Sequence, residues 1–143
     1  MRTNLFAIVI AACIGAATVA CRPEHLTVPA EPIKTVTGSW QIIKATRNGT
    51  DITSGFNFTA FRINFADSSY TLDSLVPFIV SKNGKWAFDN PTYPFNMIFT
   101  VTDSTPASFP LLFPVTNGQR NIILTFSPGC KNNSYQYTLQ QAN

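Results

Sequence analysis

Apolar and polar side chains alternate along the chain from about residue 38 to its C-terminal end, and glycine, proline, asparagine and aspartate separate the alternating runs. A period of two residues is the signature of a β-strand, because successive side chains of a strand point to opposite faces of the sheet. No run keeps a helical period for longer than two turns. The pattern therefore predicts an all-β domain.

The first predicted strand begins at Trp40 and ends near Asn48. Within it, Ile42 and Ile43 are neighbours and Ala45 follows, so apolar side chains fall on both faces of the strand. A β-bulge, which inserts one extra residue into a strand, would explain this pattern. Burial of both faces is the alternative.

Two pairs of runs predict antiparallel hairpins. In the first pair, residues 61–65 and 70–73, apolar side chains share one face and polar side chains the other. The second pair flanks Asn83 and Gly84, and this dipeptide is the strongest short hairpin signal in the chain. Its two strands are expected at residues 78–80 and 86–88.

The later runs complete a set of about eight short strands, spaced roughly 10 to 14 residues apart. Pro110 and Pro114 confine a run near residues 111–115 to a sheet edge or a bulge, because proline donates no backbone hydrogen bond. Short connections favour an up-and-down antiparallel barrel, and a β-sandwich is the alternative. The inward-facing residues of the other runs are expected to be Phe95, Met97, Phe99 and Val101, then Ile122, Leu124 and Phe126, and finally Tyr135, Tyr137 and Leu139.

Composition agrees with one small β-domain. A chain of 143 residues with 45% hydrophobic residues can bury one core but is short for two domains. Phenylalanine occurs 12 times and only 12% of the residues are charged, which suits pleated surfaces better than helices. The net charge is +3, and the lysines and arginines are scattered. Nucleic acid is therefore not an expected partner.

The N-terminal residues are typical of a secretion signal. Arg2 gives a basic start, residues 5–20 form an uncharged apolar run, and Cys21 follows directly. A membrane-spanning helix is the alternative, but the run is shorter than the roughly 20 residues needed to cross a bilayer. We therefore expect residues 1–20 to be a cleaved signal.

The residues before Cys21 resemble the bacterial lipobox, in which small residues precede a cysteine that becomes diacylated and N-terminal. Thr18, Val19 and Ala20 occupy these positions. Cys13 fits the lipobox pattern more closely, but cleavage there would leave a signal too short for a normal apolar region. Cys21 is therefore preferred as the lipidation site over Cys13 or an ordinary cut without lipid.

Lipidation would also account for the cysteines and for the segment that follows. Cys13 would leave with the signal and Cys21 would carry lipid, so Cys130 would have no disulfide partner. Residues 21–36 are rich in proline and are expected to form an extended tether. The β-domain then spans residues 37–143, held at a membrane without crossing it.

Three short segments resemble a known family. Gly38, Ser39 and Trp40 resemble the Gly-x-Trp motif of lipocalins. Residues 84–89, 96–102 and 121–126 look like the small lipocalin-like lipoproteins of Bacteroidetes, many of which are domains of unknown function. The resemblance implies a lipocalin-like barrel, and in lipocalins an arginine on a late strand packs against the tryptophan of the first strand. Arg120 is the candidate for that arginine.

The chemistry available to the β-domain is limited. It contains no histidine and no glutamate, and its single cysteine, Cys130, has no histidine beside it. The ligand set for zinc and the partners of a serine or cysteine nucleophile are therefore missing. The glycines are dispersed and form no phosphate loop. The aspartates adjoin turn signals, where aspartate serves local hydrogen bonding: Asp51, Asp67, Asp73, Asp89 and Asp103. We therefore expect no enzyme activity, no catalytic residue, no metal and no cofactor.

Aromatic residues are the candidates for ligand binding. Trp40, Trp86, Phe99, Tyr135 and Tyr137 could line an apolar cavity or stack on sugar rings. They could instead fill the core, and this is favoured, because a barrel of about eight strands is only just wide enough for its own side chains or one small ligand.

Ser74 is a candidate for modification. Asp73, Ser74 and Leu75 resemble the Asp-Ser/Thr-aliphatic motif at which Bacteroidetes O-glycosylate exported proteins. Asp103 and Ser104 give a looser match to the same motif.

These features predict a lipid-anchored binding module of the cell envelope that holds a small apolar or amphipathic molecule or a glycan. The alternative is a structural or interaction lipoprotein with a filled core and no small ligand, which docks to an outer-membrane partner through an open sheet edge. The expected location is the outer membrane. Its periplasmic face is preferred, because Arg22, Pro23 and Glu24 lack the acidic cluster that resembles a surface-export signal.

Overall fold

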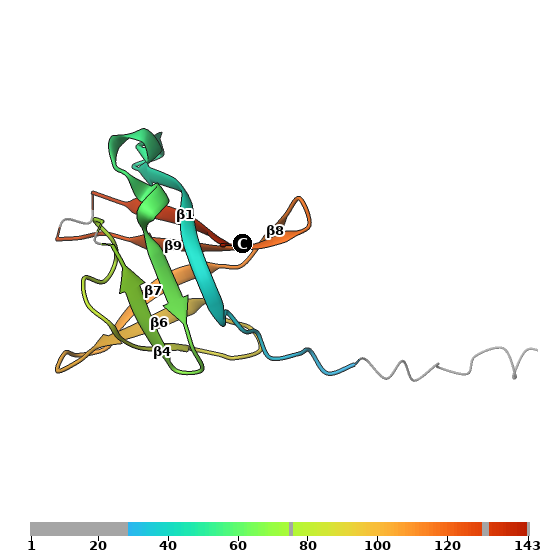
Figure 1. Ribbon diagram of the computed structural model, residues 1–143. Coiled ribbons are helices and arrows are strands. Elements are labelled where there is room, and N and C mark those ends of the chain that lie inside the picture. The colour runs from blue at the N-terminus through green and yellow to red at the C-terminus, as the bar shows by residue number, and fades with distance from the viewer. Residues whose placement is uncertain (1–28, 75, 130–131, 143) are drawn as a thin grey trace, which may run out of the picture. The chain divides into compact units, whose positions relative to one another are not determined.

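The computed structural model describes residues 29–74, 76–129 and 132–142 (Figure 1). Pro32–Asn143 forms one compact unit, which contains all the strands of the described residues. The expected signal, the lipidation site Cys21 and Cys130 lie outside the described residues, as does much of the expected tether. Within the described part of the chain, no helix is long and apolar enough to cross a membrane.

Eight strands close into an antiparallel barrel. Each pairs with the next along the chain, and the last pairs with the first. The all-β, up-and-down, lipocalin-like barrel is therefore confirmed, and the sandwich alternative is wrong. The barrel strands are β1 (Gly38–Arg47), β3 (Arg62–Phe65), β4 (Ser69–Asp73), β5 (Gly84–Phe88), β6 (Asn96–Val101), β7 (Ala107–Leu112), β9 (Gln119–Phe126) and β10 (Tyr135–Gln141).

Four short elements lie in the connections between the barrel strands. β2 (Thr50–Asp51) pairs with β1, and β8 (Val115–Thr116) pairs with β9. Two single-turn 3₁₀ helices, η1 (Thr53–Gly55) and η2 (Phe58–Ala60), follow β2 and lie at the top of Figure 1. The turn between β1 and β2 uses Asn48 and Gly49 with φ of 50° and 81°, the positive values that a tight Asn-Gly hairpin requires.

Closure depends on β10, which lies between β1 and β9. Leu139 is paired with Ile42 of β1 on one side and with Ile122 of β9 on the other. The three side chains are 0 to 5% exposed. Because both sides of β10 are hydrogen-bonded, the first and last barrel strands leave no unpaired edge between them.

The predicted bulge in β1 is confirmed. The pairing of β1 with β10 shifts between Ile42 and Lys44, which leaves Ile43 as an extra residue. Ile43 is 41% exposed, whereas Ile42 is 5% and Ala45 is 0% exposed. The inward-facing positions are therefore even-numbered before the bulge, as at Ile42, and odd-numbered after it, as at Ala45.

Side chains fill the middle of the barrel. Six of them, each at most 1% exposed, come from four different strands: Ile63, Met97, Phe99, Ile122, Leu124 and Leu139. Burying one side chain of this size contributes about 1.5 to 3 kcal/mol relative to leaving it in water. This packed layer leaves space for a ligand only toward the ends of the barrel.

Two predictions for the hairpin around Asn83 and for β6 were wrong in detail. Residues 76–83 form no strand, and the side chain of Asn83 instead accepts a hydrogen bond from the backbone N–H of Leu72, at 2.9 Å. Phe95 was expected to face inward but is 73% exposed, because β6 begins one residue later and Phe95 lies beyond the end of the strand.

The prediction for Pro110 was also wrong, because Pro110 lies within a barrel strand. β7 runs between β6 and β9, with Pro110 opposite Asn96. Its neighbour Leu111 donates its N–H to the carbonyl of Phe95 at 2.8 Å, so the nitrogen of Pro110 faces β9. Pairing with β9 begins only at Leu111, and the strand therefore loses no hydrogen bond to proline.

Arg120 does not take the role that the lipocalin resemblance implies. Its guanidinium lies 4.8 Å from the centre of the Phe113 ring and donates to the Phe113 carbonyl at 3.0 Å, on an exposed side of the barrel. Trp40 is 3% exposed, and its indole N–H donates to the carbonyl of Val36 at 2.7 Å.

Candidate functional site

One end of the barrel carries an apolar pocket of about 450 Å³. β1 and β9 end here, β10 begins here, and the irregular segment before β5 supplies one wall. The lining consists of one arginine, four aromatic side chains on the walls and one at the lip, with aliphatic groups between them: Arg47, Ile52, Phe56, Pro77, Phe78, Phe126, Pro128, Tyr135 and Tyr137.

Strand periodicity places the two tyrosines. Tyr135 and Tyr137 are two residues apart on β10, so both point toward the barrel interior. Tyr135 is paired with Phe126 of β9 on one side and with Arg47 of β1 on the other. The neighbouring strands β1, β10 and β9 therefore place these side chains side by side at the same level along the barrel axis. The end of β1, which is fixed by the Asn48 turn, determines where Arg47 lies.

The aromatic rings form a continuous wall. Phe126 and Tyr135 are stacked with centroids 5.4 Å apart and planes at 21°, and Phe78 and Tyr137 are stacked at 5.6 Å and 24°. Phe126 and Tyr137, 5.2 Å apart, join the two pairs. Behind them, Phe58 of η2 meets the edge of Tyr137 at 5.8 Å. Such contacts orient the rings beyond what burial alone requires.

Polar groups of the pocket are few. The hydroxyl of Tyr137 donates a hydrogen bond to the carbonyl of Pro77. Burial, and next repulsion between the ionised forms of Tyr137 and Tyr135, raise the pKa of Tyr137 to about 12, and this hydroxyl is neutral at physiological pH. Among the described lining residues, Arg47 is the only charged one. Its guanidinium lies 5.7 Å from the centre of the Tyr135 ring and donates to Oδ1 of Asn133 at 2.9 Å.

The structure separates the five aromatic residues predicted to line a ligand cavity. Tyr135 and Tyr137 come together in the pocket. Trp40 and Phe99 are 3% and 1% exposed and belong to the packed core. Trp86 lies toward the opposite end of the barrel, where it lines a different surface hollow.

Trp86 has a structural environment of its own. Its indole N–H donates to the carbonyl of Ala66 in the turn between β3 and β4, at 2.8 Å. Its ring packs edge-on against Phe65 at 5.3 Å and against Phe88 at 5.1 Å. Trp86 therefore fastens one hairpin turn to the next strand.

Sequence reasoning did not assign Arg47, Phe56, Phe78 or Phe126 to a binding site. Phe126 was expected to face inward, and its position at the end of a strand was the available signal. Phe78 was placed in a strand that does not form, and Phe56 lies in a segment without periodicity. Arg47 ends a strand next to a hairpin turn, and the sequence alone gives no sign that Tyr135 lies beside it.

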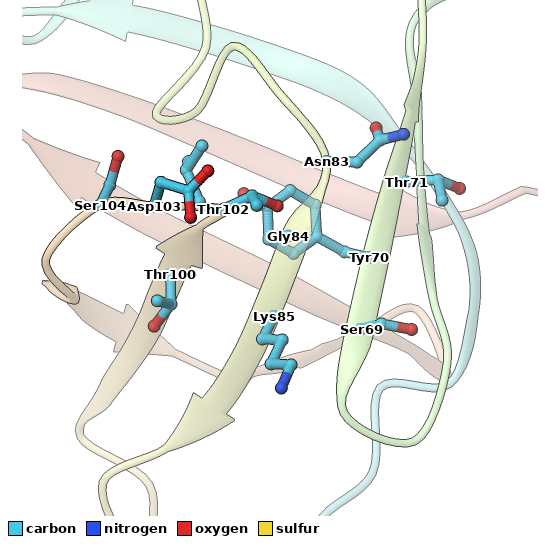
Figure 2. Close-up of a pocket in the computed structure, with 11 residues that line it drawn as sticks. Ser69, Tyr70, Thr71, Asn83, Gly84, Lys85, Thr100, Thr102, Asp103 and Ser104 are labelled. Carbon is cyan, nitrogen blue, oxygen red and sulfur yellow. The ribbon is translucent and has the colours of Figure 1, made fainter.

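A second hollow, of about 560 Å³, lies on the wall formed by β4, β5 and β6 (Figure 2). Polar side chains surround it, but they do not converge. In Figure 2, Ser69 and Thr71 point away from Thr100 and Asp103. A binding site fixes its ligand with a few converging polar groups, so this hollow is the weaker candidate.

Tyr70 and Gly84 lie side by side next to this hollow. Tyr70 is 1% exposed, and its hydroxyl has no hydrogen-bond partner among the described residues. Burial raises the pKa of Tyr70. A Cβ atom at Gly84 would lie 3.0 Å from this hydroxyl oxygen and 2.3 Å from the carbonyl oxygen of Thr100. Only glycine fits at this position of β5, where the backbone of β6 and the Tyr70 side chain of β4 approach closely.

The aspartates with identified partners serve local structure. Asp51 accepts the backbone N–H of Thr53 at 2.8 Å, and hydrogen bonds from Thr53 lower the pKa of Asp51. Asp89 accepts from Asn96 at 2.9 Å, and hydrogen bonds, first those of Asn96, lower its pKa as well. Asp73 accepts a side-chain amide of β3 at 2.9 Å. No group of three or more metal-ligating side chains occurs within residues 29–74, 76–129 and 132–142.

Ser74 follows β4 directly and is exposed, with a φ of 62°. Leu75, the third residue of the expected glycosylation motif, lies outside the described residues. A hydroxyl at this exposed bend is sterically accessible for modification.

A closed eight-stranded antiparallel barrel with an apolar pocket at one end defines this chain as a lipocalin-like β-barrel domain. The family described as "Domain of unknown function (DUF5004)" matches residues 16–140, which is most of the chain. The chain therefore belongs to this family, and the expectation of a domain-of-unknown-function family is confirmed. No curated protein and no solved structure matches the chain.

Proposed function

We propose that this protein is an exported, lipid-anchored binding module of the bacterial cell envelope, whose barrel holds one small apolar or amphipathic molecule. The observation that carries the proposal is the aromatic pocket at the end of the barrel. Its volume of about 450 Å³ falls within the range of roughly 300 to 1,000 Å³ that is typical of small-molecule sites. Aromatic and aliphatic side chains with few polar groups are also typical of such sites.

The packed core limits the size of the ligand. Phe58 and Phe61 are at most 3% exposed and belong to the packed core. Their rings contact the lining residues Tyr137 and Phe78, respectively. A ligand would therefore occupy the mouth rather than the full length of the barrel. A compact molecule suits this space better than a long glycan, which would need an open groove with many hydrogen-bonding groups.

The ligand proposal can be tested by mass spectrometry. Residues 22–143, without the lipid, would be purified from the periplasm of a related bacterium, and the native mass of this protein compared with its denatured mass. An extra mass that is lost on denaturation is expected. Phe56→Asp, which puts a charge at the half-exposed lip, should abolish the extra mass. Ile43→Asp, at a similarly exposed site outside the pocket, should retain it. A bare chain mass in every sample would contradict the proposal.

The membrane anchor is supported by the apolar run at residues 5–20 and by the lipobox-like residues before Cys21. Two or three acyl chains are sufficient for stable attachment, whereas one is marginal. We propose attachment to the outer membrane of a member of the Bacteroidetes, with the periplasmic face preferred. Metabolic labelling with a fatty acid should mark the wild-type chain and Cys13→Ser, but not Cys21→Ser. Label on Cys21→Ser would contradict this assignment.

An interaction module without a ligand is the second candidate, and an exposed aromatic patch favours it. Tyr93 and Phe95 are 60% and 73% exposed and share a surface hollow of about 240 Å³ with Phe113 and Arg120. Exposed aromatic clusters of this kind commonly mark protein contacts. A photo-crosslinker at Phe95, but not at Ile43, should then capture an envelope protein in intact cells. Capture together with a bare native mass would favour this candidate.

A further inference from the structure

We propose that the pocket selects amphipathic ligands with a flat aromatic ring system and one anionic group, and that Arg47 holds the anion at the mouth of the pocket. This inference rests on the proposed function, because it names the ligand class for the same pocket. It follows from the charge of the lining, the hydrogen bonds of Arg47 and the arrangement of the rings.

The pocket lining is positively charged. Arg47 supplies a positive charge, and no described carboxylate lines the pocket. The hydrogen-bond partner identified for its guanidinium is the neutral side chain of Asn133, which leaves the positive charge uncompensated by this contact. Arg47 is exposed at the mouth of the pocket, and one face of its guanidinium lies against the Tyr135 ring. An anionic group of a bound ligand that contacts this guanidinium would displace water from it and gain a charge-assisted hydrogen bond.

The position of the guanidinium is restricted before a ligand binds. It lies 5.7 Å from the centre of the Tyr135 ring and donates to Asn133 at 2.9 Å. A guanidinium has five N–H donors, so the bond to Asn133 leaves a planar set that matches a carboxylate or a sulfonate. The hydroxyl of Tyr137 is already bonded to Pro77. Arg47 and Tyr135 are therefore the main polar contacts for a ligand.

The rings favour a flat ligand. The two stacked pairs, Phe126 with Tyr135 and Phe78 with Tyr137, have interplanar angles of 21° and 24°. Phe126 and Tyr137 hold the two pairs 5.2 Å apart. Planar aromatic ligands stack on such faces in offset geometry, whereas flexible acyl chains gain no preference from parallel rings.

Two fluorescent probes with the same ring system test the inference: the anionic 1-anilinonaphthalene-8-sulfonate and the neutral N-phenyl-1-naphthylamine. All strands of the closed barrel lie within Pro32–Asn143, so the mature chain from residue 21, without lipid, contains the complete fold and avoids detergent. The wild-type chain should bind the anionic probe about tenfold more tightly than the neutral one, as expected for one charge-assisted contact.

Matched variants separate charge from packing. Arg47→Gln should remove the preference for the anionic probe over the neutral one, and Arg47→Lys should retain part of this preference. Arg120→Gln is the control, because Arg120 also lies over an aromatic ring but outside this pocket. Phe56→Asp should lower the affinity for the anionic probe more than the affinity for the neutral probe.

Three other results of the probe-binding experiment would contradict the inference. If both probes bind equally to the wild-type chain, or if Arg47→Gln leaves the preference intact, the charge selectivity is wrong while the pocket remains. If neither probe binds to the folded chain, both this inference and the small-molecule pocket of the proposed function are wrong.

Discussion

The hydroxyl of Tyr137 on β10 donates a hydrogen bond to the backbone carbonyl of Pro77, which precedes it by 60 residues. Pro77 lies in the irregular segment between β4 and β5, where no strand ladder holds the backbone. The Tyr137 ring also stacks on Phe78, the next residue of that segment. One buried tyrosine therefore fixes a wall of the pocket to the closed sheet.

Replacing Tyr137 with phenylalanine should destabilise the protein and loosen the pocket. The ring would remain, but the Pro77 carbonyl would lose its partner, which costs about 1 kcal/mol for a typical hydrogen bond. The free energy of unfolding, measured with urea, should fall by this amount, and probe affinity should decrease. Tyr135→Phe, at the partly exposed end of the same strand, is the control and should change stability less. An unchanged free energy of unfolding for Tyr137→Phe would contradict the assignment.

Tyr137 should also make stability depend on alkaline pH. Its pKa is about 12 in the folded protein, against an ordinary value of 10.0. Between these values the unfolded chain has lost the proton that the folded chain keeps, so raising the pH favours unfolding. The free energy of unfolding should therefore fall between about pH 10 and 12 more steeply for wild type than for Tyr137→Phe. Parallel curves would show that this group does not carry the dependence.

Removing the hydroxyl of Tyr70 should have the opposite effect on stability from removing the hydroxyl of Tyr137. Its buried hydroxyl has no partner among the described residues, so Tyr70→Phe removes a group whose desolvation is uncompensated. We expect Tyr70→Phe to be neutral or more stable by up to about 1 to 3 kcal/mol, measured by urea unfolding. A clear loss of stability would mean that the hydroxyl has a bonding partner, such as a bound water.

Gly84 should tolerate no side chain. A Cβ atom there would lie 2.3 Å from the backbone oxygen of Thr100, so the backbones of β5 and β6 would have to separate. Gly84→Ala should cost about 1 to 3 kcal/mol through overpacking. At Gly55 a Cβ atom would meet nothing within 4 Å, so Gly55→Ala is the matched control. Equal melting temperatures of the two variants would argue against this crowding.

Ser74 should carry a glycan in the native bacterium, because Asp73, Ser74 and Leu75 resemble an O-glycosylation motif. The intact mass of the wild-type protein should then exceed the mass of the polypeptide and its lipid, and Ser74→Ala should remove the increment. Ser104→Ala, at the looser motif, should retain it. A wild-type mass without any increment would remove this prediction.

Local sequence patterns specified the strands well where neighbouring residues decide the structure. The β3–β4 hairpin has the predicted alternation, with Phe65 opposite Tyr70. The bulge at Ile43 was expected because apolar residues changed face within one strand. Pro110 was misleading, because the cost of a missing donor depends on which neighbouring strand its nitrogen faces. The run before Asn83 was also misleading, because a hairpin signal does not say how long the flanking strands are.

The sequence by itself determined that this chain forms short antiparallel strands around one core, because side chains with a period of two alternate between the core and solvent. It did not determine how high along the barrel each side chain lies. Arg47, Phe78 and Tyr135 come from distant segments and meet only because β10 closes the sheet between β1 and β9. Closure and strand register therefore decided which aromatic residues fill the core and which line the pocket, since these depend on long-range pairing that no local pattern encodes.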